Sequence, residues 1–280
     1  MLLFFYPMKY VFFNIKNKNT MKQNFKTFSL LFCVLAMTAM CACTKDNNNP
    51  NNGGGNGGGN GGSNNTYNGH AYVDLGLPSG TLWATCNVGA NSPEEYGYYF
   101  AWGETEPKAA MYDWDHYKYS NGTGDEQGLT KYCHRESHGH SAGYHGFFDN
   151  LTSLEPIDDA ATANWGEGWC MPTPEQWKEL WDCTVTRRHY HAENGIGTNG
   201  WSFSDDENGQ RIFLPAAGMF CPDGLEGVNS EGHYWSNSLD DWDFDAWKCC
   251  FDAHQEYSDL HSSDRYLGLP VRPVRSVRKN

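Results

Sequence analysis

Residues 80–88 read GTLWATCNV, a run rich in β-branched and aromatic side chains that ends at Gly89. This composition, bounded by a turn residue, is typical of a short β-strand. Residues 98–102 (YYFAW) predict a second strand, and Asn208-Gly209 predicts a hairpin whose turn uses left-handed backbone conformations. The strands of that hairpin and two further strands are expected at residues 201–203, 211–214, 233–236 and 271–274.

One helix start is unusually well marked. Thr173 can cap a helix, Pro174 suits its first position, and Gln176 completes a capping box with Thr173. The spacing that follows predicts one apolar face made of Trp177, Leu180 and Trp181. A shorter helix is expected at 158–164, where two acidic residues suit the amino end. Few helices among many short strands predict an α+β domain.

The first 42 residues contain five Lys and no acidic residue, and they include an apolar run at 28–40. The run is too short to span a bilayer but suits a signal-peptide core, with Met21 as the natural start. It leads into the sequence MCAC, which resembles a bacterial lipoprotein signal in which Cys43 carries the lipid. We therefore expect residues 1–42 to be a leader; an ordinary signal peptide or an N-terminal anchor is the alternative.

Residues 47–69 consist almost entirely of Asn and Gly. The GGGNGGGNGG run within them has no strand before it and no helix after it, so a phosphate-binding loop is excluded. We expect residues 43–69 to be a lipidated cysteine followed by a flexible tether, and residues 70–280 to form one domain. The lipid would attach this domain to a membrane.

The chain has 34 acidic and 20 basic side chains, for a net charge of −14. Neutralising phosphates requires clustered Lys and Arg, so a nucleic-acid partner is excluded. Aromatic residues make up 15% of the chain, including 11 Trp, which indicates that most of the chain folds around a core.

A set of short segments, taken in order, resembles a known family. They are VDLGLPSGTLWA (73–84), GYYFAWGE (97–104), DDAA (158–161), WCMPT (169–173), FLPAAG (213–218), YWS (234–236) and VRPV (271–274). Together they resemble the Fibrobacter succinogenes major paralogous domain, which is common in exported Bacteroidetes lipoproteins. The resemblance implies a C-type-lectin-like fold related to the formylglycine-generating-enzyme group, but it supplies no catalytic residues. Cys170 stands where that family usually has Arg.

Two groups of His and Cys side chains are candidate metal ligands. The denser group has spacings that permit zinc, although solvated loop histidines are the commoner outcome: Cys133, His134, His138, His140 and His145. His189 and His191 alternate, so both would lie on one face if this segment were a strand, and nothing else marks them.

The acidic residues Asp241, Asp243, Asp245 and Asp252 have spacings like those of a calcium loop. Ala246 replaces its glycine and Asp252 its final glutamate, and alternation with aromatics also suits a half-buried strand or a surface loop. Ser238 follows Trp235-Ser236-Asn237 where a sugar-binding lectin would have Asp, so calcium chelation of sugar is unsupported. We predict no metal and no cofactor.

An oxidase of the formylglycine-generating type would need paired cysteines, and Cys249 and Cys250 are adjacent. Nothing in the sequence places them beside a base or a metal. We therefore predict that the protein is not an enzyme.

Residues 238–267 mix aromatic, His, Asp and Ser side chains with no sustained period. Such a mixture suits a binding surface, because it offers rigid contact area and adaptable hydrogen bonds; a core strand edged by loops is the alternative. The candidate ligand-binding residues are Trp242, Phe244, His254, Tyr257, His261 and Tyr266. In some relatives of this fold the corresponding region is diversified by a retroelement.

These observations predict an outer-membrane lipoprotein exposed at the cell surface, which binds an extracellular glycan or protein. The competing hypotheses are a structural envelope or adhesin component and, less favoured, an enzyme of the formylglycine-generating type.

Overall fold

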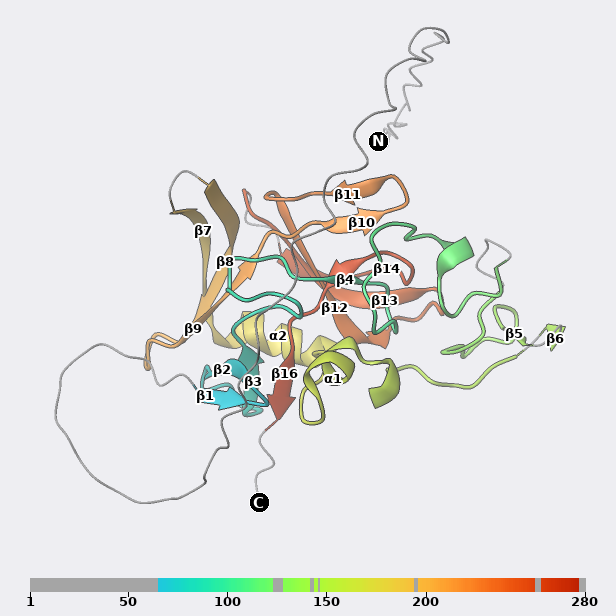
Figure 1. Cartoon of the computed structure of the whole chain (residues 1–280). Helices are drawn as coiled ribbons and strands as arrows, with labels where there is room; N and C mark the ends of the chain where they lie inside the picture. Colours follow the sequence, from blue (N-terminus) through green and yellow to red (C-terminus); the bar gives the residue numbers. More distant parts are fainter. Residues whose placement is uncertain are drawn as a thin grey trace, which may run out of the picture. The chain divides into compact units, whose positions relative to one another are not determined.

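The computed structural model describes residues 65–122, 128–141, 144–145, 147–193, 196–254 and 258–276. All of these residues lie within the unit Gly59–Asn280. This part of the chain is mostly β-structure, with several small antiparallel sheets and two short α-helices (Figure 1). The prediction of many short strands and few helices is therefore confirmed. No helix in the described part is long and apolar enough to cross a membrane.

The first and last described strands share one sheet. Its order is β1-β2-β3-β16, and every pairing is antiparallel (Figure 1). The strands are β1 (Asn65–Tyr67), β2 (His70–Asp74), β3 (Thr81–Ala84) and β16 (Val274–Ser276). The two edge strands of this sheet, β1 and β16, are therefore about 200 residues apart in the sequence.

Two three-stranded sheets and three small ladders make up the other β-structure. One sheet contains β7 (Val185–Glu193), β8 (Ile196–Ser204) and β9 (Arg211–Pro215); the other contains β12 (Glu231–Leu239), β13 (Asp245–Asp252) and β14 (Ser258–Asp264). The ladders pair β4 (Tyr99–Phe100) with β15 (Leu269–Pro270), β5 (His140–Ser141) with β6 (Tyr144–His145), and β10 (Met219–Cys221) with β11 (Gly224–Glu226).

Both predicted helices are present. Helix α2 (Pro174–Cys183) begins at the Thr173 cap, and the complete capping box with Gln176 is formed. Helix α1 (Ala160–Trp165) is capped by the Asp159 carboxylate, which accepts from the Thr162 N–H. The 3₁₀ turns are η1 (Trp114–His116) and η2 (Pro156–Asp158). Helix α2 packs against β12, β13 and β14 (Figure 1).

The strands predicted at 80–88 and 271–274 are shorter than expected, because a buried arginine interrupts their pairing. The N–H groups of Ala84 and Val88 bind the carbonyls of Pro273 and Val271. Between these bonds, the fully buried Arg272 side chain donates to the carbonyls of Ala84 and Thr85, as well as to Asn87 Oδ1 and Phe213 O. A side chain therefore occupies carbonyls that a regular ladder would use.

The predicted hairpin between β8 and β9 is confirmed, but its turn is longer than a two-residue turn. Gly209 is left-handed at φ +68°, whereas Asn208 is not among the residues with positive φ. Asp205 N–H donates to Gln210 O, and the Asn208 carboxamide accepts from Gln210 N–H. These bonds stabilise a wider loop, so Asn208 does not need the left-handed conformation.

The β12–β13–β14 sheet separates two clusters of buried side chains. Trp235 and Ala246 belong to the first cluster, whereas Tyr234, Cys249 and Phe251 belong to the second. Successive strand residues point to opposite faces, so each face of this sheet covers a different cluster.

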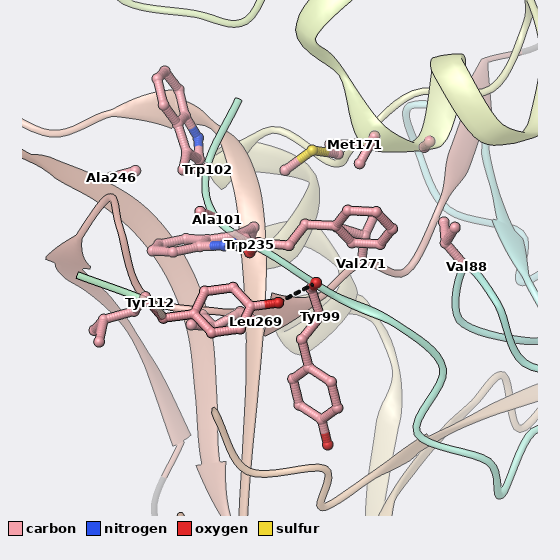
Figure 2. Close-up of a cluster of buried hydrophobic side chains, with 14 of the residues drawn as sticks. Val88, Tyr99, Ala101, Trp102, Tyr112, Met171, Trp235, Ala246, Leu269 and Val271 are labelled. Atoms are coloured by element: carbon pink, nitrogen blue, oxygen red, sulfur yellow. Dashed lines mark hydrogen bonds between the residues drawn. The ribbon is translucent and has the colours of Figure 1, made fainter. Parts of the chain in front are cut away.

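In the first cluster, buried Trp N–H and Tyr O–H groups donate hydrogen bonds to backbone carbonyls, as Figure 2 shows for Tyr112. Trp102 Nε1 donates to Ser236 O at 2.9 Å, and Trp235 Nε1 donates to Phe100 O at 2.8 Å. The Tyr112 hydroxyl donates to Tyr99 O at 2.7 Å (Figure 2). The two indoles thus link β12 to the segment around β4.

Candidate functional site

Four of the candidate binding residues lie at the two ends of the β13–β14 hairpin. Trp242 and Phe244 precede β13, and Tyr266 follows β14, at the end where Asp245 pairs with Asp264. His254 follows β13 at the opposite end, near the Phe251–Ser258 pair. Eight strand residues span about 27 Å, so these side chains do not form one patch.

The other candidates are placed individually. His261 is exposed on β14, the edge strand of its sheet. Tyr266 packs edge-on against Trp114, with ring centroids 5.1 Å apart, and burial raises the pKa of its hydroxyl to about 12. Tyr257 and the predicted lipidation residue Cys43 lie outside the described residues.

Trp242 and Phe244 meet a loop from a distant part of the sequence. We call Trp242, Phe244, Arg135 and His138 the Trp242 surface. The Arg135 guanidinium lies 4.5 Å from the Trp242 ring centroid, and the His138 ring lies 5.2 Å from that of Phe244. Arg135 also donates to Asp241 O at 2.7 Å. The indole remains 49% exposed although its position is held by these contacts.

The turn that carries Trp242 is fastened by the buried carboxylate of Asp243, whose side chain has no exposed area. Asp243 accepts hydrogen bonds from the backbone N–H of His134 at 3.2 Å and of Arg135 at 2.9 Å. The Cys133 thiol donates to it at 3.3 Å, and His138 Nδ1 lies 3.2 Å from Oδ2. His134 Nδ1 contacts the other carboxylate oxygen. One carboxylate therefore aligns the whole 133–138 loop.

A second carboxylate shapes the same loop. Asp149 accepts from the N–H groups of Tyr132 and Cys133, each at 2.9 Å, and of Leu151 at 3.1 Å. Tyr132 has φ +58°, a left-handed conformation that is costly for an aromatic residue. The surrounding hydrogen bonds hold it there, so the loop reaches Asp243 in one conformation.

The geometry of Asp243 does not match a calcium loop. Asp243 lies in a turn and not in a strand, and its oxygens accept hydrogen bonds from protein donors instead of facing an open cation site. In residues with described side chains, no three His, Cys, Asp or Glu groups are arranged to hold a metal ion. The side chains of His140, His145, His189 and His191 lie outside that description.

The seven cysteines of the described part are all free thiols. Cys249 and Cys250 are neighbours in β13 and therefore face opposite sides of the sheet. Burial raises the pKa of both thiols, and it raises the pKa of Cys133 and Cys170 to about 12. A raised pKa disfavours the nucleophilic thiolate, so this geometry does not support a reactive vicinal pair.

The choice of Trp242 and Phe244 as binding residues stays a prediction, and the sequence contained no signal for Arg135 beside them or for the role of Asp243. Residues 133–138 attracted notice as a His/Cys cluster, and the structure uses them as donors around one aspartate. More than 100 residues separate the two segments, so no local pattern could have paired them.

Comparison with protein-family models, with curated proteins and with solved structures finds no match for this chain.

Proposed function

We propose that this protein is a lipid-anchored outer-membrane protein that binds an extracellular glycan through the Trp242 surface. The proposal includes the C-type-lectin-like fold that the sequence resemblance implies. The observation that carries it is the indole of Trp242, which is half exposed yet held in place by Arg135. A pre-positioned aromatic ring loses little conformational entropy when it binds.

The size and chemistry of the surface favour a glycan over a protein ligand. A stable protein interface buries about 800 Å² on each partner, whereas one aromatic side chain buries about 150–250 Å². The apolar face of one sugar ring matches a single indole in size. Arg135 and His138 are placed beside the ring, where they can hydrogen-bond sugar hydroxyls.

Trp242→Ala tests this surface. On a glycan array, we expect the variant to bind at least about tenfold more weakly than wild type, because loss of a central aromatic contact costs about 1–2 kcal/mol or more. Tyr98→Ala is the matched control, since Tyr98 is also 49% exposed and lies outside the Trp242 surface.

Two results would contradict the glycan proposal. Glycan binding that is equally strong in wild type and Trp242→Ala would place the site elsewhere. Binding of wild type to proteins on a parallel array, with no glycan retained, would identify the ligand class as protein.

The anchor has its own test. Cells that express the full chain would be grown with labelled palmitate, and the protein would be recovered from the membrane fraction. We expect Cys43→Ala to abolish labelling, because the thiol is the attachment atom, whereas Cys41→Ala should retain it. Labelling that persists in Cys43→Ala would contradict the proposed lipid anchor.

A further inference from the structure

Lys248 is a buried lysine in the middle of β13, and only 6% of its surface is exposed. Buried lysines are almost always paired with a carboxylate. Among the described residues Lys248 has no such ion pair; its Nζ lies 3.2 Å from Nδ1 of His233, in β12. The amine is therefore hydrogen-bonded to a nitrogen base.

His233 is oriented in turn by a carboxylate. Its Nε2 lies 2.9 Å from Oε2 of Glu231, whose side chain is 48% exposed. With Nε2–H donating to Glu231, Nδ1 is left with its lone pair toward Lys248. Amine, imidazole and carboxylate thus form the sequence of nucleophile, base and orienting group found in enzymes that activate a nucleophile.

The surroundings favour the uncharged form of this pair. Burial lowers the pKa of Lys248, and burial together with the Lys248 charge lowers the pKa of His233 to about 4. Other titratable groups near Lys248 come from its own strand and from the elements around it: Cys249 and Cys250 in β13, Glu231 in β12, Cys221 in β10, and His261 and Asp259 in β14. The Cys and Glu groups favour the ammonium, but burial outweighs them.

Lys248 lies on the central strand of its sheet, between β12 and the edge strand β14. The exposed His261 of β14 pairs directly with Lys248. Glu231 is half exposed and Cys221 is only partly buried. The carboxylate end of the Lys248–His233–Glu231 chain therefore reaches solvent.

We propose that Lys248 is a nucleophilic amine that captures small aldehydes as an imine, with His233 as its base. The Lys248 nitrogen forms a bond to the carbonyl carbon, and the C=O π electrons move onto the oxygen. His233 Nδ1 takes one proton from that nitrogen and delivers it to the oxygen, which gives the neutral carbinolamine. His233 then takes the second N–H proton and delivers it to the hydroxyl, which leaves as water while the nitrogen lone pair forms the C=N bond, so His233 ends uncharged. The balance is one amine and one aldehyde consumed, and one imine and one water formed.

Reductive trapping on the full chain tests the proposal without a variant. Acetaldehyde and cyanoborohydride would be added over a pH series, and ethylation of each lysine would be measured by peptide mass spectrometry. At pH 6.5 we expect Lys248 to react at least about tenfold faster than Lys178, because the lowered pKa of Lys248 leaves it a larger neutral fraction than Lys178 has. Lys178 is the reference because it is exposed and its ion pair with Asp182 raises its pKa. A Lys248 rate equal to or below that of Lys178 would overturn the proposal.

A pair of variants tests the role of His233. His233→Gln keeps a hydrogen-bonding side chain but cannot take a proton, so we expect the Lys248 rate to fall at least about tenfold. His261→Gln, directly opposite Lys248, is expected to leave the rate unchanged. Circular dichroism and the unfolding midpoint would verify that both variants fold. Equal rates in the two variants would remove His233 from the mechanism, and if His233→Gln does not fold, the wild-type pH series decides.

Discussion

Replacement of Asp243 by alanine is expected to lower the free energy of unfolding by about 3–5 kcal/mol. The carboxylate accepts hydrogen bonds from the 133–138 loop, and its removal leaves two partly buried N–H groups without this acceptor. The same change releases Arg135 and His138 from their positions beside Trp242. Glycan binding should therefore fall at least as far as in Trp242→Ala.

Urea unfolding gives the stability change, and the glycan array gives the binding change. Asp241→Ala is the matched control, because the Asp241 side chain is exposed and only its backbone carbonyl binds Arg135. We expect this control to change stability by no more than about 0.5 kcal/mol. An Asp243 variant as stable as the Asp241 variant would show that the buried carboxylate does not fasten the loop.

Replacement of Arg265 by methionine is expected to cost about 3–5 kcal/mol, because it leaves several buried acceptors unpaired. Arg265 is fully buried and donates to the carbonyls of Tyr132, Asp243 and Lys131, and to the Tyr117 hydroxyl. Its guanidinium also lies 5.0 Å from the Trp102 ring centroid. Methionine restores part of the volume but none of the donors.

Arg265→Lys separates charge from geometry. Lysine keeps the charge but cannot reproduce the planar fork, so we expect a loss of about 2–3 kcal/mol. Arg211→Met on β9 is the control, since Arg211 is exposed and should change stability by no more than about 0.5 kcal/mol. Thermal and urea unfolding measure all three variants. Full stability in Arg265→Lys would mean that the charge alone, without the fork, is sufficient.

Local signals predicted the local structure well. The start of α2 was predictable because its capping box is contained in residues 173–176, and the β8–β9 hairpin because its strands are close in sequence. The early end of β3 was not predictable, because it depends on Arg272, which reaches Asn87 from 185 positions away. Side-chain donors that replace a β-ladder leave no periodic pattern in the sequence.

In the candidate site, too, local features were predictable from the sequence and long-range contacts were not. Trp242 is 49% exposed, so its side chain lies at the surface, and its role in binding stays a prediction. The selection of His254 together with Trp242 assumed that neighbours in sequence share a surface, but an antiparallel hairpin moves them to opposite ends. The contact between Asp243 and the 133–138 loop depends on the tertiary fold, which composition does not reveal.

The pairing of β3 with β16 also has a consequence for the time at which this chain can fold. Contacts between Trp102 and Ser236, and between Arg272 and Asn87, span 134 and 185 positions, and chains dominated by such distant contacts fold slowly. At about 5–20 residues per second, about 10–40 s separate the synthesis of β3 from that of β16. During that interval β3 can pair with β2 but lacks its second partner, β16, so this sheet stays incomplete until nearly the whole chain has been made. The open side of β3 is exposed to aggregation until that last strand arrives.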